Sequence, residues 1–204
     1  MTDDRDAILA RVKGALAPLS ERASLPDYAK DLAVVRKKLA GKDLIEAFAE
    51  QLANVNGETL FSVEALAARL LKGGWTRGYC DPALMASVGS RLGSAFTVET
   101  TFDRTRVDDY AFGITAASGG IAETGTLILR DRQTSRRLGA LAPWVHVAVV
   151  SKDTIFSDLA QAVDALGDDP NVIWCTGPSK TADVEGILIE GVHGPGAQFA
   201  LILS

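Results

Sequence analysis

The chain has 204 residues, of which 47% are hydrophobic, and a formal net charge of −5. A chain of this length can bury one substantial core, and its acidic balance, without a dense basic stripe, argues against nucleic acid as a partner. We expect no targeting leader and no membrane span, because the first residues fit no signal or transit peptide and no apolar run approaches ~18–20 residues.

The two cysteines, Cys80 and Cys175, lie far apart in the sequence. Their spacing fits no zinc, iron–sulfur or disulfide-scaffold pattern. We therefore expect no metal, no bound cofactor and a reducing, cytoplasmic location.

The first quarter of the chain has the pattern of helices. Apolar residues repeat at helical spacing over residues 8–16 and again over 32–52, where Gly41 interrupts the stripe. We predict an N-terminal helical extension over residues 1–55 and an α/β domain over 56–204. The first helix needs a partner surface, on the body of the protein or on another subunit, so the sequence leaves the oligomeric state open.

From Gly57 onward, strands and helices alternate. We predict strands near 58–61, 76–80, 95–100, 127–129, 145–150, 171–175 and 198–203, and helices over 62–72, 82–92, 153–166 and 182–190. This alternation is typical of βαβ units, whose right-handed crossovers place helices on the faces of a largely parallel sheet. It predicts the α/β class, with ligand-binding loops at the carboxyl ends of the strands.

A stretch of small residues, Gly113–Thr126, interrupts this rhythm. Its glycines and alanines permit a close approach of backbone, either to another chain segment in a tight crossing or to a ligand. Glu123 is a lone carboxylate there, which is costly to bury unless it is paired or acts as an acid, base or nucleophile. The candidate ligand-binding residues of the stretch are Thr115, Thr124, Gly125 and Thr126.

Arginines cluster in the polar loop that follows. The cluster comprises Arg130, Arg132, Arg136 and Arg137. It is either a solvated turn or an anion clamp, in which Arg137 would bind the ligand, because guanidinium groups bind carboxylates and phosphates bidentately.

The segment Trp174–Glu185 reads as the end of a strand buried on both faces, a Gly-Pro turn, and the start of a helix. Ser179 or Thr181 would cap that helix, and Asp183 would lie in its first turn. Such a helix start either serves only the helix or also holds an anion. The candidate ligand-binding residues here are Gly177, Ser179, Lys180, Thr181 and Asp183.

His193 lies in the glycine-punctuated segment Gly191–Gly196 before the last strand. It is either a hydrogen-bonded structural residue or an acid–base group, because histidine titrates near neutral pH.

Two nucleotide-binding motifs can be rejected. The sequence Gly120-x4-Gly125-Thr126 lacks the lysine of a Walker loop, and no G-x-G-x-x-G joins a strand to a helix, so neither an NTPase nor a Rossmann dinucleotide site is supported.

Three blocks together resemble the lactate utilization protein C family, the stand-alone form of the LUD domain. They are Gly113–Thr126, Gly177–Glu185 and Gly191–Pro195. Lys180 departs from the family pattern, which usually has arginine there. The resemblance implies an α/β/α sandwich similar to coenzyme A transferases, sugar-phosphate isomerases and 5-formyltetrahydrofolate cyclo-ligase. It also implies a role in oxidising L-lactate to pyruvate, beside iron–sulfur subunits that carry the cysteine-rich modules this chain lacks.

Three functions follow as hypotheses. The first is a non-redox subunit of an iron–sulfur lactate-oxidising system; the second is a self-sufficient enzyme that uses Glu123 on a carboxylate, acyl-coenzyme A or folate-like ligand; the third is an assembly scaffold. For the site, we predict one anion-accepting cleft at the carboxyl edge of the sheet. In it Glu123 and the nearby threonines face the turn at residues 177–181, Lys180 and Arg137 neutralise the ligand, and His193 is a secondary catalytic candidate.

Overall fold

The computed structural model describes residues 4–18, 41–130, 137–167, 171–182 and 186–203. The chain divides into two compact units, residues 1–34 and 35–204. The first contributes the helix α1 (Asp4–Leu16), whose apolar side chains, as predicted, recur at helical spacing, and none of its residues is buried. The predicted helical stretch at 32–39 falls outside the described residues, as do Arg132, Arg136 and Asp183.

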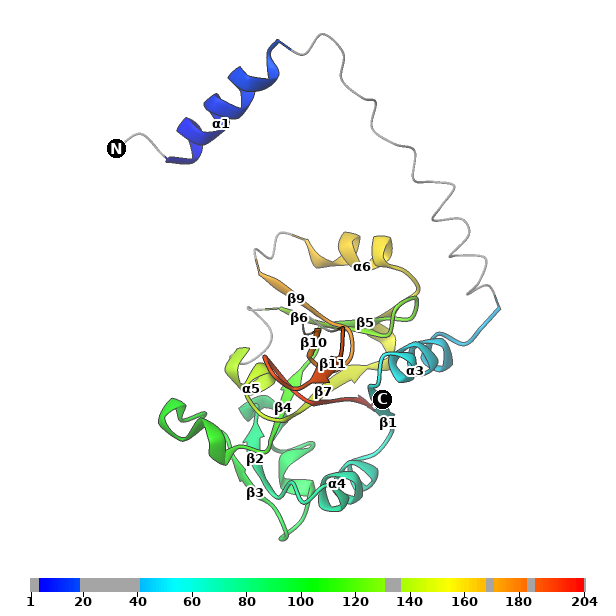
Figure 1. Ribbon diagram of the computed structural model, residues 1–204. Coiled ribbons are helices and arrows are strands. Elements are labelled where there is room, and N and C mark those ends of the chain that lie inside the picture. Colours follow the sequence, from blue (N-terminus) through cyan, green and yellow to red (C-terminus); the bar gives the residue numbers. More distant parts are fainter. Residues whose placement is uncertain (1–3, 19–40, 131–136, 168–170, 183–185, 204) are drawn as a thin grey trace. The chain divides into compact units, whose positions relative to one another are not determined.

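The larger unit is built on a six-stranded sheet (Figure 1). Its strands are β1 (Glu58–Leu60), β2 (Arg77–Cys80), β3 (Thr97–Glu99), β4 (Phe112–Ala116), β7 (Val145–Ser151) and β12 (Ala197–Leu203). They follow the order β1-β12-β7-β4-β2-β3, and every neighbouring pair is parallel. The predicted α/β class with a largely parallel sheet is therefore confirmed.

A second, four-stranded sheet packs against the first. It comprises β5 (Gly119–Ile121), β6 (Thr126–Arg130), β8 (Ile155–Phe156) and β9 (Val172–Cys175), in the order β8-β5-β6-β9. The pairs β5–β6 and β6–β9 are antiparallel, and β5–β8 is parallel. The predicted strand at 171–175 is thus real, but it is an edge strand with Trp174 39% exposed. The prediction that it is buried on both faces was wrong.

The alternation of side chains along β7 shows how the layers stack. Val145 and Val147 belong to the core cluster that contains the inner face of α4 (Val63–Lys72), whereas Ala148 and Val150 belong to the cluster on the opposite face. That second cluster includes residues of β6 and of α3 (Leu44–Asn54), and α6 (Leu159–Leu166) packs on the outer face of the four-stranded sheet. Helices therefore cover both sides of the strands, which confirms the α/β/α sandwich.

The structure confirms one of the predicted helix starts and changes two predicted helices. Ser62 does cap α4, since its hydroxyl accepts a hydrogen bond from the amide of Ala65 at 3.1 Å. The predicted helix at 82–92, however, is two 3₁₀ turns, η1 (Pro82–Leu84) and η2 (Gly89–Arg91). The predicted helix at 153–166 begins only at the start of α6, because η4 (Lys152–Thr154) and β8 precede it.

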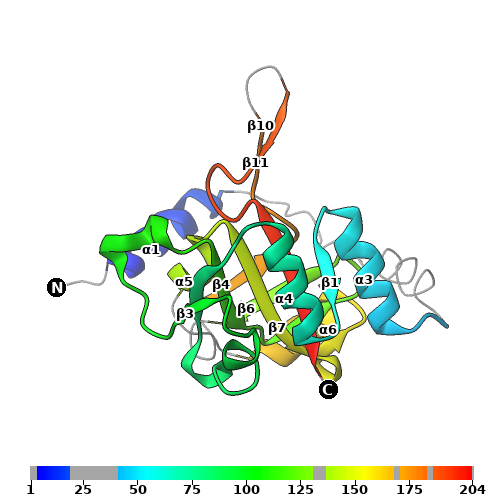
Figure 2. The same ribbon diagram turned by 90° about the horizontal axis from the view of Figure 1, so that it is seen from below.

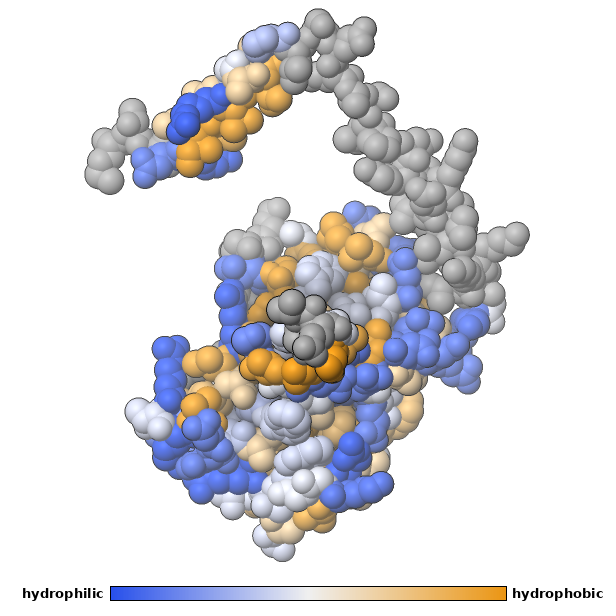
Figure 3. Space-filling view, in the orientation of Figure 1, coloured by the Kyte–Doolittle hydropathy of each residue, from blue (hydrophilic) through white to orange (hydrophobic). Residues whose placement is uncertain are grey.

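The largest correction concerns the helix predicted at 182–190. The described residues on either side of 183–185 instead pair as an antiparallel hairpin of β10 (Lys180–Ala182) and β11 (Leu188–Glu190), which projects from the body (Figure 2). Gly186 has a φ of +77°, which breaks a helix, and the apolar run beside it suits a strand. The hairpin's side chains at 187–189 are 45–64% exposed and contribute apolar surface (Figure 3).

No helix in the described part of the chain is long and apolar enough to cross a bilayer.

Candidate functional site

Three polar side chains are buried side by side within the six-stranded sheet. Thr115 lies on β4, His146 on β7 and Gln198 on β12, and their exposed fractions are 0%, 1% and 3%. His146 and Gln198 are direct neighbours in the strand register. By the alternation of the strands, all three point toward the four-stranded sheet.

These side chains satisfy one another's hydrogen bonds. Thr115 Oγ1 lies 2.9 Å from His146 Nε2, and Gln198 Nε2 lies 3.0 Å from His146 Nδ1. Burial lowers the pKa of His146 to about 4, so the imidazole is neutral near pH 7. With the Gln198 amide donating to Nδ1, Nε2 carries the proton and donates to Thr115. The network is preformed and uncharged.

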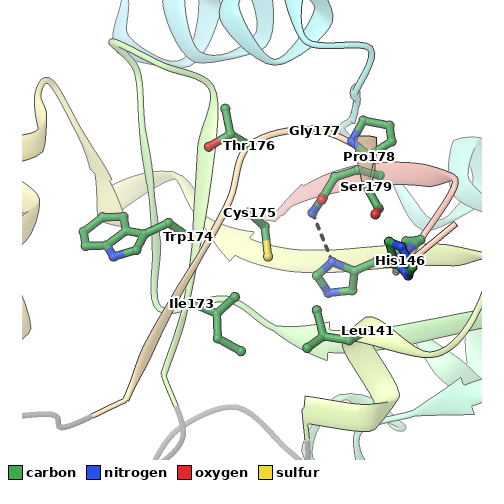
Figure 4. Close-up of a pocket in the computed structure, with 13 residues that line it drawn as sticks. Leu141, His146, Ile173, Trp174, Cys175, Thr176, Gly177, Pro178 and Ser179 are labelled. Atoms are coloured by element: carbon green, nitrogen blue, oxygen red, sulfur yellow. Dashed lines mark hydrogen bonds between the residues drawn. The ribbon is translucent and has the colours of Figure 1, made fainter. Parts of the chain in front are cut away.

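This network borders a pocket of about 360 Å³ (Figure 4). The pocket is lined by Leu141, His146, Ile173, Trp174, Cys175, Thr176, Gly177, Pro178, Ser179, His193, Gly194, Pro195 and Gln198. His146 and Gln198 are the second residues of β7 and β12. The pocket therefore lies beside the amino-terminal ends of these strands, whereas the sequence led us to expect a ligand at the carboxyl edge.

Main-chain contacts hold the pocket's wall in place. The Ser179 amide donates to the Pro195 carbonyl at 2.8 Å, and the Gly191 amide donates to the Ser179 carbonyl at 2.9 Å. Gly177 has a φ of +76°, and a Cβ there would collide with the Val55 carbonyl at the end of α3. Only glycine fits this turn, so the Gly-Pro turn serves the packing of α3 as well as the pocket.

Cys175 brings a thiol to the pocket, and Figure 4 shows its sulfur directed into the same space as the His146 ring. Burial raises the pKa of this thiol to about 11. Cys80 is fully buried in the core beneath α4, so the two thiols belong to different parts of the interior. Among the described residues, no group of three or more histidine, cysteine or acidic side chains could hold a metal ion.

Several residues predicted from the sequence meet at this pocket. Gly177, Ser179 and His193 line it, and Thr115 is hydrogen-bonded to the pocket residue His146. The predicted threonines Thr124 and Thr126 connect to it through a chain of hydroxyl groups. Their Oγ1 atoms lie 2.6 Å apart, and Thr126 Oγ1 lies 2.8 Å from that of Thr176 in the pocket wall.

The predicted charged groups lie elsewhere. Glu123 accepts a hydrogen bond from the Leu159 amide, at the start of α6, at 3.2 Å. Lys180 and Thr181 lie on the hairpin strand β10. The ammonium group of Lys180 donates a hydrogen bond to the Val55 carbonyl at 2.9 Å. Arg137 is the first residue of α5 (Arg137–Leu141). Glu123, Lys180 and Arg137 are not among the described residues that line the pocket.

The stretch of small residues packs against other parts of the chain. A Cβ at Gly120 would lie 2.9 Å from the Phe48 ring of α3. Gly125, with a φ of +66°, approaches the backbone of Leu52 so closely that no Cβ would fit. At these two glycines the close approach is a tight crossing with α3.

Two pocket residues that the site prediction missed are His146 and Gln198. Each is a polar residue within a run of buried apolar residues, in strands that the sequence predicted well. A buried polar side chain needs a partner, so its appearance in such a run was the available signal.

The fold and the site define an α/β/α sandwich with a pocket of small-molecule size beside its parallel sheet. The model of the LUD domain family matches residues 85–203, which is more than half of the chain, and the chain belongs to this family. All three sequence blocks that carried the resemblance lie in that region.

Named relatives match a shorter region. Lactate utilization protein C from Macrococcus caseolyticus is 40% identical over 91 residues, which cover 41% of this chain and 39% of the relative. The proteins of the same name from Bacillus subtilis and Deinococcus radiodurans are 36% and 37% identical, and the matches cover 38% and 41% of their lengths. The matches thus span about two fifths of these relatives.

One solved structure resembles the fold. A crystal structure of a DUF162 family protein from Deinococcus radiodurans aligns with a TM-score of 0.55, covering 79% of this chain and 96% of that chain. The sequence identity is 20%, so this likeness supports the fold alone.

Proposed function

We propose that this protein serves lactate utilisation, as a subunit of a system that oxidises L-lactate to pyruvate. The observation that carries the proposal is membership of the LUD domain family, together with relatives named lactate utilization protein C. Because the matches span about two fifths of those relatives, we assign their role to this chain as a proposal.

The chemistry assigns this chain a supporting part. Oxidation of lactate to pyruvate removes two electrons and two protons, which an electron acceptor must take. The two cysteines of the chain lie in different core clusters and cannot act as a dithiol pair or supply the four thiolates of an ordinary iron–sulfur cluster. We therefore propose iron–sulfur companion subunits as the site of electron transfer, in the cytoplasm, with this chain as their non-redox partner.

Deletion of the gene tests the role. We expect a strain that lacks it, and lacks any redundant lactate oxidase, to lose growth on L-lactate and to regain it with the wild-type gene. A tagged chain should also co-purify with cysteine-rich proteins from lactate-grown cells. Normal growth of the deletion strain on L-lactate would contradict the proposal.

A self-sufficient enzyme built on Glu123 has less support. One oxygen of the Glu123 carboxylate accepts a hydrogen bond from the Leu159 amide, which is a capping interaction, and Glu123 does not line the described pocket. A thermal-shift screen with lactate, pyruvate, acyl-coenzyme A and folates tests this alternative. Stabilisation by one of them that Glu123→Gln abolishes would favour the enzyme.

A further inference from the structure

Gln198 presents an unused carboxamide edge to the pocket. The residue is 3% exposed and lines the cavity, and one of its amide hydrogens is donated to His146 Nδ1. Its carbonyl oxygen and second amide hydrogen have no hydrogen-bond partner among the described residues. A buried polar group of this kind normally finds a partner, so the edge is available to a ligand.

The pocket also lacks a fixed charge. The described residues that line it include no lysine, arginine, aspartate or glutamate. The nearby cation Lys180 is already held by the Val55 carbonyl and lies 4.0 Å from the Glu190 carboxylate. An anionic ligand would therefore lose its hydration without gaining a permanent countercharge, which is costly.

The rest of the lining is largely apolar. Leu141, Ile173, Pro178 and Pro195 contribute aliphatic surface, whereas the Trp174 side chain points away from the pocket on the other side of β9 (Figure 4). A volume of about 360 Å³ lies within the range of small-molecule sites, which are mostly apolar and have a few well-placed polar groups.

We propose that this pocket binds a small uncharged molecule that carries an amide or lactam edge. The Gln198 carboxamide forms a pair of hydrogen bonds with that edge, one donated and one accepted. Thr115 and His146 act as positioning residues, because they fix the orientation of the Gln198 amide through the buried network. This ligand differs in class from lactate, and the proposal stands independently of the role in lactate utilisation.

Cys175 is a built-in reporter of occupancy. It lines the pocket and is partly exposed, whereas Cys80, the other cysteine of the chain, is fully buried. The rate at which N-ethylmaleimide alkylates Cys175 in the native full-length chain should therefore fall when a ligand fills the pocket. Mass spectrometry of the labelled peptide identifies the site, and mildly alkaline buffer offsets the raised pKa of the thiol.

Benzamide and benzoate form a matched pair of probes, because they have nearly the same shape and differ in charge. At about ten times its dissociation constant, benzamide should slow the alkylation about tenfold, in proportion to the unoccupied fraction, whereas the same concentration of benzoate should slow it less than about twofold. Equal or stronger protection by benzoate, or no protection by benzamide, would overturn the proposal.

The variant Gln198→Met tests the hydrogen-bonding edge while keeping a side chain of similar length. It should lose the protection by benzamide, whereas the same substitution at Gln161, an exposed residue of α6, should keep it. Retained protection in Gln198→Met would refute the role of the carboxamide. If that variant fails to fold, the comparison of benzamide with benzoate on the wild-type chain still decides the ligand class.

Discussion

The buried imidazole of His146 should make the stability of this protein depend on pH in a way that can be calculated. Burial lowers its pKa from 6.5 to about 4 in the folded protein, whereas the unfolded chain keeps the ordinary value. As the pH falls, the unfolded chain therefore binds the proton first. The contribution is fully present above about pH 6.5 and is lost as the pH falls toward about 4.

The size of the effect follows from linkage. A shift of one pKa unit corresponds to about 1.4 kcal/mol, so lowering the pH from about 7 to about 4.5 should cost about 2 kcal/mol through His146 alone. Carboxylates also titrate in this range, and their contribution must be subtracted. The variant His146→Gln does this, because it keeps a polar side chain but does not titrate.

The assay is urea unfolding of the wild-type chain and of His146→Gln at the two pH values. We expect the wild-type free energy of unfolding to fall by about 2 kcal/mol more than that of the variant. His193→Asn is the matched control, because this histidine is exposed, and it should behave as the wild type. An equal fall in the wild type and in His146→Gln would show that the imidazole is not held neutral by burial, and the reasoning about the uncharged network would be wrong.

Three further substitutions test the fold and the predicted site. Thr115→Val should cost about 1–3 kcal/mol in urea unfolding, because it leaves a buried imidazole N–H without an acceptor, whereas Thr97→Val on the exposed position of β3 should cost little. Gly125→Ala should destabilise more than Gly74→Ala, since both have φ near +70° but only Gly125 meets backbone, and equal losses would contradict the crossing with α3. Glu123→Gln should fold normally, since its amide oxygen can still accept the helix N–H; complementation of growth on lactate by this variant would remove the predicted chemical role of Glu123.

The elements that the sequence predicted well are those whose signal is local. The strands at 145–150 and 198–203 are apolar runs apart from His146 and Gln198, and α4 has both a helical stripe and a serine cap. Such a pattern predicts both the secondary structure and the buried face of a segment, whichever segment packs against it. These segments form the centre of the parallel sheet and one of its covering layers.

The second sheet could not be predicted in the same way. Its strand β5 reads Gly-Gly-Ile and carries no periodicity, so pairing with β6 and β8 decides its conformation. The apolar run at 187–189 is equally compatible with a short helix and a strand, and the hairpin partner β10 settles the choice. In both cases the missing information is which distant segment lies alongside.

The site prediction divides along a similar line. Gly177, Ser179 and His193 were singled out as turn and titratable residues, and they line one pocket. The prediction of an anion cleft drew on a helix start near Thr181, where the described residues 180–182 form strand β10, and on the charge of Lys180, whose ammonium group donates to the Val55 carbonyl. Side-chain types suggest a ligand class, but their existing partners decide whether they are free to bind it.

The pocket arises where the apolar filling between the two sheets ends. Along β7 the inward row runs from Val150 and Ala148 to His146, and the first two share a core cluster with residues of α3. At His146 the row becomes polar, and its neighbour on β12 is Gln198. Burying these groups would be costly if they were unpaired, yet the Thr115 contact completes the histidine's hydrogen bonds without any ligand. A ligand therefore meets an edge that is already oriented and does not have to order it, which favours binding by a small, rigid molecule.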